Sequence, residues 1–278
     1  MDIRHILNKG EKILSNLPNP ALDCSILTAH FLEADRLSLA VNLDKEIDKD
    51  TEDKILRAFE LRKTLCPLEY ITGVKNFYGY NFKVNKGVLI PRFDTENLVE
   101  RVLKKLEDRG SGSLSGLEIG TGTGIISITL LKERNELVMT AADISDYALE
   151  NAAENARAFG VEDRFDLIKS DIYENITGEF DFLVSNPPYI KTADIKTLEV
   201  QVRDYEPETA LDGGADGLYF YRRIIKHAPV KKHGFAAFEI GCDQAGQAEK
   251  LLKDENFVNI KIYKDLSGFD RVVIAEKI

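Results

Sequence analysis

The run Asn-Pro-Pro-Tyr at 186–189 carries the residue types best suited to chemistry in this chain. It follows an apolar stretch that is typical of a buried strand, and two consecutive prolines cannot continue a sheet ladder. Asn186 is therefore expected at the carboxyl end of a strand, where open α/β folds bind ligands. Its side-chain oxygen and the Pro187 carbonyl are two acceptors that suit an NH2 group held for alkylation. The Tyr189 ring can cover a flat amide or base, and Pro188 completes this substrate-binding corner.

A glycine-rich run at 117–124, Leu-Glu-Ile-Gly-Thr-Gly-Thr-Gly, lies upstream. A Pro-Pro pair alone is better explained as a strand-ending turn, and only this second motif reverses that preference. The apolar residues on both sides predict a strand, a tight turn and a helix, and glycine lets the backbone approach a ligand closely. Ile125 stands where the dinucleotide fingerprint has its third glycine, and no Gly-Lys-Ser/Thr follows. The cofactor-binding candidates in this loop are Gly120, Thr121, Gly122, Thr123 and Gly124.

Acidic residues end the next two predicted strands. Asp143 closes the strand 137–142. Its spacing along the sequence from the glycine loop is that of the acidic residue that holds ribose hydroxyls in nucleotide-binding folds. The strand 165–169 leads to Asp171, which can accept from an adenine amino group, and to Ile172, which can pack on the ring. Taken singly, either acid is equally well explained as a solvated helix cap. Four consecutive strand ends that carry a glycine loop, a ribose acid, an adenine acid and Asn-Pro-Pro-Tyr argue against chance.

This order of motifs resembles the S-adenosylmethionine-dependent methyltransferases that modify planar NH2 groups. Further segments resemble the HemK-type N5-glutamine methyltransferases over nearly the whole chain. These segments lie at 70–73, 77–79, 88–92, 206–207, 210–214, 216–218, 221–222, 239–241, 265–268 and 270–271. The resemblance implies S-adenosylmethionine as cofactor, Asn186 also beside that cofactor, and methylation of the glutamine in the Gly-Gly-Gln motif of peptide chain release factors. Release factors are therefore the expected protein partners.

One position departs from the family pattern. The family usually reads Pro-Arg-Pro-Glu-Thr-Glu, and this chain has Phe93 in place of the second proline. We expect this change to loosen a loop without abolishing activity. The motif's other positions hold Pro91, Arg92, Asp94, Thr95 and Glu96.

Three alternatives share parts of this pattern. A sister glutamine methyltransferase that acts on a ribosomal protein would carry the same core motifs. An N6-adenine or N2-guanine nucleic-acid methyltransferase would use Asn-Pro-Pro-Tyr on a flipped base. A non-catalytic cofactor-binding scaffold is disfavoured, because a scaffold has no need for Asn-Pro-Pro-Tyr.

The net charge of −10 bears on the nucleic-acid alternative. Nucleic-acid binders generally need a basic footprint, because phosphate contacts dominate their affinity. Here 47 acidic residues face 37 basic ones, and no dense Lys/Arg cluster stands out. No direct nucleic-acid substrate is expected, although a local basic patch would escape this argument.

The remaining composition is that of an ordinary soluble protein, with 44% hydrophobic and 30% charged residues. The sequence has no apolar run of roughly 18 residues or more and no basic-then-apolar leader. We therefore expect a cytoplasmic protein that does not bind membranes. Cys24, Cys66 and Cys242 are odd in number and far apart, so neither a disulfide framework nor a metal site is expected.

The domain organisation is predicted to change once along the chain. Helical spacing of apolar residues over 1–75 predicts a small bundle, interpreted as a substrate-binding domain. Aromatic and β-branched residues at 76–90 predict a β-hairpin linker. Strands alternate with helical segments over 91–278, which we interpret as the methyltransferase domain. The Gly/Ser stretch 110–113 is predicted to be a flexible connection.

The predicted fold class is α/β. Strands are expected near 115–119, 137–142, 165–169, 180–185, 234–240, 258–264 and 270–276. The last two are joined by a connection too short for a crossover helix, so we expect them to pair antiparallel. A seven-stranded, mostly parallel sheet with one reversed strand is also what the family resemblance implies.

Overall fold

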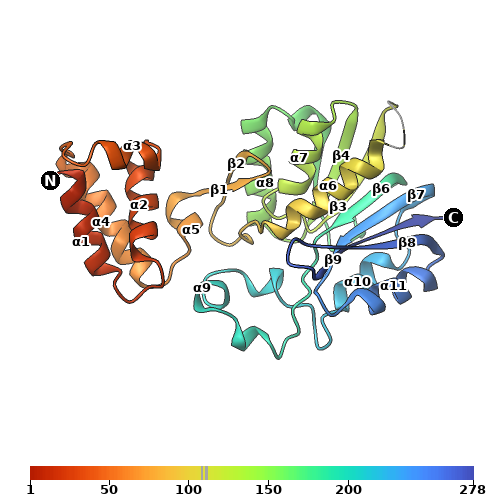
Figure 1. Ribbon diagram of the computed structural model, residues 1–278. Coiled ribbons are helices and arrows are strands. Elements are labelled where there is room, and N and C mark those ends of the chain that lie inside the picture. Colours follow the sequence, from red (N-terminus) through yellow and green to blue (C-terminus); the bar gives the residue numbers. More distant parts are fainter. Residues whose placement is uncertain (108, 110–111) are drawn as a thin grey trace. The chain divides into compact units, whose positions relative to one another are not determined.

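Strands alternate with helices over most of the chain in the computed structural model, which describes residues 1–107, 109 and 112–278. Residues 110 and 111 of the predicted flexible connection lie outside the described residues. The chain divides into two units, drawn in Figure 1. The helical unit comprises Met1–Val74 and Glu199–Tyr205, and the sheet unit comprises Lys75–Leu198 and Glu206–Ile278.

The helical unit consists of short helices whose first turns are capped by side chains. Its helices are α1 (Ile3–Ile13), α2 (Pro20–Phe31), α3 (Arg36–Val41), α4 (Lys49–Lys63), α5 (Leu68–Thr72) and α9 (Val200–Arg203). Asp2, Asp35 and Asp48 each accept a backbone N–H at the start of α1, α3 and α4, which satisfies a donor that the helix itself leaves free. Pro20 opens α2 at the first helical position, where its missing N–H leaves no helical bond unmade. The predicted amino-terminal helical bundle is therefore confirmed.

A buried ion pair lies inside the helical unit. Arg62 Nε donates to Asp23 Oδ2 at 2.7 Å, and Arg62 Nη1 donates to the Cys66 carbonyl at 2.9 Å. These bonds matter because a buried charge without a partner is strongly destabilising. The α9 segment joins the same unit through Tyr205, whose hydroxyl donates to the Thr64 carbonyl at 2.7 Å.

The predicted hairpin is present as β1 (Val74–Phe77) and β2 (Tyr80–Lys83). Its two-residue turn is formed by Tyr78 and Gly79, with φ of 51° and 79°. Positive φ at both central residues is the geometry that matches the twist of a tight hairpin.

The main sheet has seven strands in the order β5-β4-β3-β6-β7-β9-β8. The strands are β3 (Leu114–Ile119), β4 (Leu137–Asp143), β5 (Phe165–Lys169), β6 (Phe180–Ser185), β7 (Val230–Glu239), β8 (Phe257–Lys264) and β9 (Asp270–Lys277). β9 runs antiparallel to both of its neighbours, and the β3–β4, β3–β6, β4–β5 and β6–β7 pairings are parallel. The predicted mostly parallel sheet with one reversed strand is confirmed, and β7 begins at Val230 rather than at 234.

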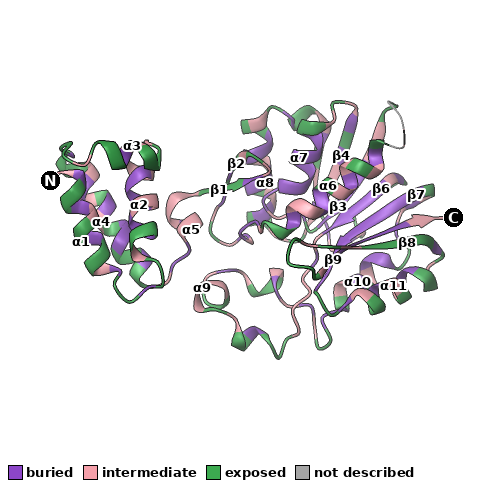
Figure 2. Ribbon diagram, viewed as in Figure 1, coloured by how far each residue is buried: buried purple, intermediate pink, exposed green. Residues whose placement is uncertain are grey.

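Helices cover both faces of this sheet (Figure 1). The helices of one face are α6 (Asp94–Glu107), α7 (Ile125–Glu133) and α8 (Asp146–Phe159), and those of the other are α10 (Tyr219–Ile225) and α11 (Ala245–Asp254). Short 3₁₀ turns lie at Glu162–Arg164, Ile195–Thr197 and Glu208–Ala210. Figure 2 shows the central strands as the most buried part of the unit, as expected for a parallel sheet between two helical layers.

The strand order reverses between β3 and β6. Ile119 pairs with Ser185 in register, so the last residues of these two strands lie side by side. Gly120 follows the last residue of β3, and Asn186 follows the last residue of β6. Open α/β sheets bind ligands in the crevice at such a reversal, which brings the two motifs of the sequence to one place.

No helix among the described residues combines the length and the apolar character that crossing a membrane requires.

Candidate active site

A cavity of about 160 Å³ lies at the carboxyl ends of β3, β4, β5 and β6. Most residues predicted from the motifs line it together. They are Gly120, Thr121, Gly122, Thr123, Asp143, Asp171, Ile172, Asn186, Pro187 and Pro188. Gly124 and Tyr189 are not among the lining residues.

The glycine loop after β3 turns sharply because its three glycines have positive φ, of 75°, 57° and 81°. The position of Gly124 explains why it does not line the cavity. A Cβ there would lie 2.9 Å from Ile128 Cδ1 and 3.2 Å from Ala152 Cβ. Gly124 therefore lets the start of α7 pack closely on α8, whereas Gly120 and Gly122 leave room for a ligand beside the loop.

Asp143 is held by the backbone at the end of β4. Its Oδ2 accepts from the N–H of Gly122 at 3.0 Å, and its Oδ1 accepts from the N–H of Ser145 at 2.9 Å. Burial raises the pKa of Asp143, and these hydrogen bonds oppose that increase. The carboxylate thus joins the glycine loop to the neighbouring strand while lining the cavity.

Asp171 and Ile172 follow β5. Asp171 has an ion-pair partner that the sequence did not indicate. Asp171 Oδ2 forms an ion pair with Arg223 Nη2 at 2.9 Å. Ile172 is 7% exposed and has φ of 55°, a rare conformation for a β-branched residue. Its carbonyl accepts from the Ser170 hydroxyl at 3.1 Å. Backbone strain of this kind is found where a binding site requires it.

Glu118 is a cavity-lining residue that the sequence analysis did not assign a role. It is 0% exposed, and its Oε2 accepts from the Thr121 hydroxyl at 3.0 Å and from the Ser127 N–H at 3.2 Å. Its Oε1 is buried and has no hydrogen-bond partner among the described residues. Burial raises the pKa of Glu118 to about 7. The sequence could have indicated Glu118 as a site residue, because it is an acidic residue inside an apolar strand. Such a group is costly to bury unless something binds it.

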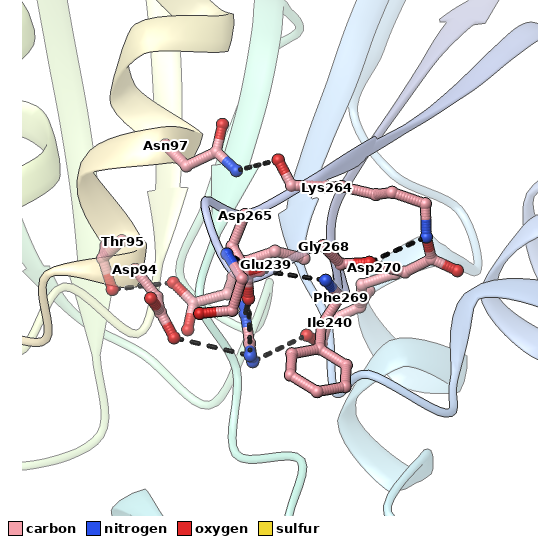
Figure 3. Close-up of polar contacts among 12 residues, drawn as sticks. Asp94, Thr95, Asn97, Glu239, Ile240, Lys264, Asp265, Gly268, Phe269 and Asp270 are labelled. Carbon is pink, nitrogen blue, oxygen red and sulfur yellow. Dashed lines mark hydrogen bonds and ion pairs between the residues drawn. The ribbon is translucent and has the colours of Figure 1, made fainter.

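Asn186 is linked to two further buried residues. Its Nδ2 donates to Thr95 Oγ1 at 3.2 Å, and Thr95 Oγ1 donates to Glu239 Oε2 at 2.7 Å. Figure 3 shows the Thr95 and Glu239 side chains pointing toward each other from α6 and the end of β7. Burial raises the pKa of Glu239 to about 7. This polar chain leaves the Asn186 Oδ1 as the end of the amide that can accept from a ligand.

Tyr189 turns toward the same glutamate. Its hydroxyl donates to Glu239 Oε1 at 3.4 Å, and its carbonyl accepts from Gln244 Nε2 at 2.9 Å. Gln244 also donates to the Gly217 carbonyl at 3.2 Å, which fixes the chain after the two prolines. The ring is not part of the cavity lining, so its predicted contact with a substrate amide stays a prediction.

Arg271 joins three segments near Glu239. It lies 3.4 Å from Asp94 and 3.2 Å from Asp265, and it donates to the Ile240 carbonyl at 3.4 Å. Asp94 begins α6 and Asp265 lies in the turn between β8 and β9. One guanidinium therefore fixes the first turn of α6, and with it Thr95, against the sheet.

A second ion pair lies at the edge of the cavity. Arg92 Nη2 lies 2.5 Å from Glu206 Oε1, and Glu206 Oε2 accepts from the Ile90 N–H at 3.0 Å. Glu206 is 5% exposed, and the following Pro207 and Thr209 line the cavity. Glu206 thus links Arg92 and the Ile90 backbone to the loop that continues into Pro207.

The described residues contain no group of three or more His, Cys, Asp or Glu side chains placed to hold a metal ion.

Two family profiles match the chain. The Methyltransferase small domain matches residues 94–203, and the PrmC N-terminal domain matches residues 5–73. A release factor glutamine methyltransferase of Clostridium botulinum is 37% identical, with 100% of both chains covered. One of Fusobacterium nucleatum is 39% identical over 98% of this chain and 78% of the relative.

A solved structure with a similar fold is a 16S rRNA methyltransferase of T. thermophilus in complex with AdoMet and guanosine. The TM-score is 0.53 at 17% identity, covering 74% of this chain and 50% of that one. At this identity the likeness supports the fold alone.

Proposed function

This chain belongs to the release factor glutamine methyltransferase family, and on that premise we propose that it methylates peptide chain release factors. The methyl group would go from S-adenosylmethionine to the side-chain amide nitrogen, N5, of the glutamine in their Gly-Gly-Gln motif. The observation that carries this proposal is the place of Asn186. An amide oxygen that is free to accept lies at the strand end beside the glycine loop.

The residues around the cavity fit S-adenosylmethionine. When bound, this cofactor supplies an electrophilic methyl group on a positively charged sulfur. The unpartnered Oε1 of Glu118 suits the ammonium group of its methionine part. Asp143 suits the ribose hydroxyls, and Ile172 with the remaining oxygen of Asp171 suits adenine. The glycine loop brings backbone close to the ligand without side chains in the way.

The substrate amide poses a problem of positioning. A carboxamide nitrogen is a poor nucleophile, because its lone pair is delocalised into the carbonyl. Asn186 Oδ1 and the Pro187 carbonyl would accept its two N–H groups and aim the nitrogen at the methyl group. Positioning of this kind contributes roughly 7–11 kcal/mol to lowering a barrier. The same oxygens favour the positive charge that develops on nitrogen. The alkylated amide then loses a proton readily, so no strong base is required.

Both the net charge of this chain and its family favour a protein substrate over a nucleic-acid substrate. The net charge of −10 opposes binding to a phosphate backbone. A ribosomal protein glutamine would meet the same acceptors, so only the destination of the methyl group separates that alternative. The curated relatives that match this chain over nearly its whole length are named for release factors.

We propose that residues 1–75 bind the release factor, that 76–90 link the two parts, and that 91–278 carry catalysis, in the cytoplasm. Leu37 and Val41 lie one turn apart on α3 and are 81% and 79% exposed, which suits contact with a protein partner. The double variant Leu37→Glu with Val41→Glu should raise KM for the release factor and leave kcat unchanged. An unchanged KM would remove this face of α3 from the proposed contact.

The deciding experiment follows a tritiated methyl group. The purified protein is incubated with labelled S-adenosylmethionine and, separately, with release factor, ribosomal protein and ribosomal RNA. We expect label in the release factor alone. A release factor in which alanine replaces the Gly-Gly-Gln glutamine should stay unlabelled, and the Asn186→Ala enzyme should label the natural release factor far more slowly than the wild type. Label in RNA or in the ribosomal protein would replace the proposed substrate.

A further inference from the structure

We propose that Thr95 and Glu239 are positioning residues that hold the Asn186 side chain with its Oδ1 turned toward the substrate amide. The inference rests on the proposed function, because it explains how that reaction obtains an acceptor at this place. It concerns residues of α6 and β7, which lie far from Asn-Pro-Pro-Tyr in the sequence.

The direction of the hydrogen bonds follows from the chemistry of the three groups. Oε2 of Glu239 lies 2.7 Å from Thr95 Oγ1, which lies 3.2 Å from Asn186 Nδ2. An ionised carboxylate only accepts, so the single hydroxyl proton of Thr95 must point to Glu239. The Thr95 oxygen then accepts from Asn186, and only the NH2 end of the amide can donate. The Oδ1 end is consequently the one left for the substrate.

A neutral Glu239 would reverse this order. A protonated carboxyl can donate to Thr95, whose own proton would then turn to Asn186 and select its Oδ1. The NH2 group of Asn186 would face the cavity and oppose the NH2 group of the substrate. Two donors cannot bond to each other, so the charge of Glu239 determines whether Asn186 can hold the substrate.

Thr95 and Glu239 are buried, whereas Asn186 is half-buried at the cavity. Thr95 and Glu239 are each 1% exposed, so solvent cannot replace either partner. The second carboxylate oxygen of Glu239 accepts from the Tyr189 hydroxyl at 3.4 Å. The backbone carbonyl of Glu239 accepts from the Tyr221 hydroxyl at 2.7 Å. Because burial makes a missing hydrogen bond costly, each group in this chain of hydrogen bonds keeps its role as donor or acceptor.

Burial of Glu239 dominates its pKa, and the neighbouring polar and charged groups modify it. The titratable or charged groups that face it or its neighbour Arg271 are Asp94 from α6, Tyr189 after β6, Tyr221 from α10, Arg271 from β9 and Asp265 from the β8–β9 turn. Burial raises the pKa of Glu239 to about 7, whereas the Thr95 hydrogen bond and Arg271 lower it. Glu239 is therefore ionised above pH 7 and becomes neutral as the pH falls below it.

The first test compares two variants of Thr95. Thr95→Val keeps the shape of the side chain but removes the hydroxyl, and Thr95→Ser keeps the hydroxyl. At pH 8 and saturating S-adenosylmethionine, Thr95→Val should lower kcat for release factor methylation by about 10- to 100-fold, because Asn186 loses its fixed orientation. Thr95→Ser should stay within about threefold of the wild type, since one hydrogen-bonding group is preserved. Values of KM should change little in either variant.

The second test observes Asn186 without catalysis. In protein labelled with 15N-asparagine, the side-chain NH2 signal of Asn186 is assigned by its loss in Asn186→Ala. This signal should shift between pH 6 and 8 with a midpoint near 7, and kcat of the wild type should rise through the same interval. Both changes should vanish in Glu239→Gln, because the glutamine cannot ionise. A titration that persists in Glu239→Gln would overturn the proposal.

The outcomes separate this inference from the proposed function. If the wild type methylates the release factor and Thr95→Val does so with equal kcat, the positioning role is wrong and the function stands. If Thr95→Ser is impaired as severely as Thr95→Val, the hydroxyl is not the cause and the role is again wrong. If the wild type leaves the release factor unlabelled, the proposed function fails, and the NMR titration still tests the hydrogen-bond direction.

Discussion

Two buried glutamates of the same sheet, Glu118 on β3 and Glu239 on β7, share a pKa raised to about 7 but differ in their partners. Glu118 has one oxygen that is buried without a partner among the described residues, and it lines the cavity. Both oxygens of Glu239 are bonded, one to Thr95 and one to Tyr189. Similar burial and similar acidity therefore serve different purposes. The incomplete group fits a cationic ligand, whereas the complete group orients its neighbours.

On the proposed function, the site has a cofactor side around Glu118 and a substrate side around Glu239. The cofactor side has an unbonded carboxylate oxygen at Glu118 and an unusual backbone conformation at Ile172, both of which line the cavity. Both carboxylate oxygens of Glu239 are already bonded within the protein, so we expect the effect of this side to appear in turnover rather than in cofactor affinity. Variants on the cofactor side should change cofactor affinity, whereas variants on the substrate side should change turnover.

The largest effect is expected from Asn186→Ala, which removes the acceptor of the substrate side. We expect kcat to fall by about 100- to 1,000-fold, the usual loss when one preorganised polar group is removed from a reacting centre. Affinity for S-adenosylmethionine, measured by calorimetry, should stay near that of the wild type. Asn8→Ala, at an exposed position of α1, is the matched control. Lost cofactor affinity with normal turnover would place Asn186 on the cofactor side.

Asp143→Ala tests the cofactor side. Removing this carboxylate should weaken binding of S-adenosylmethionine by about 10- to 100-fold, since hydrogen bonds to charged groups contribute roughly 1.5–3 kcal/mol. The exposed Asp166 on β5 offers a control in Asp166→Ala. Thermal unfolding should be recorded alongside, because Asp143 also holds the glycine loop. Unchanged affinity in a folded Asp143→Ala protein would remove this residue from the site.

A smaller effect is expected from the titration of Glu118. Its pKa of about 7 means that the carboxyl gains a proton as the pH falls from 8 to 6. Only the ionised form attracts an ammonium group, so affinity for S-adenosylmethionine should fall by up to about tenfold over this interval. Glu118→Gln should bind weakly at both pH values, with little change between them. An equal pH dependence in wild type and variant would assign the titration to another group.

The smallest effect is expected from Tyr189→Phe. This variant removes a hydrogen bond of 3.4 Å to Glu239 and keeps the ring. A bond of this length is weak, so kcat should fall by less than about threefold. A loss as large as that of Asn186→Ala would mean that the hydroxyl takes a direct part on the substrate side. The pH profile of kcat should shift slightly to higher pH, because the Tyr189 bond lowers the pKa of Glu239.

Much of the fold could be predicted from the sequence because its signals are local. Short apolar runs predicted the strands, and the short connection before β9 predicted the reversed pairing. Ser145 lies two residues after Asp143 and caps the start of α8. The start of this helix therefore also follows from residues that are close in the sequence. The motifs of the cavity were also visible, since ligands bind at strand ends in this type of sheet.

The sequence by itself determined which residues end the strands and hence which ones can meet at the cavity. Only the tertiary structure decided their partners: Thr95 and Glu239 beside Asn186, and Arg223 on Asp171. Tyr189 faces Glu239 rather than the cavity for the same reason. Backbone pattern depends on neighbours in the chain, but the direction of a buried hydrogen bond depends on groups that packing brings from distant elements.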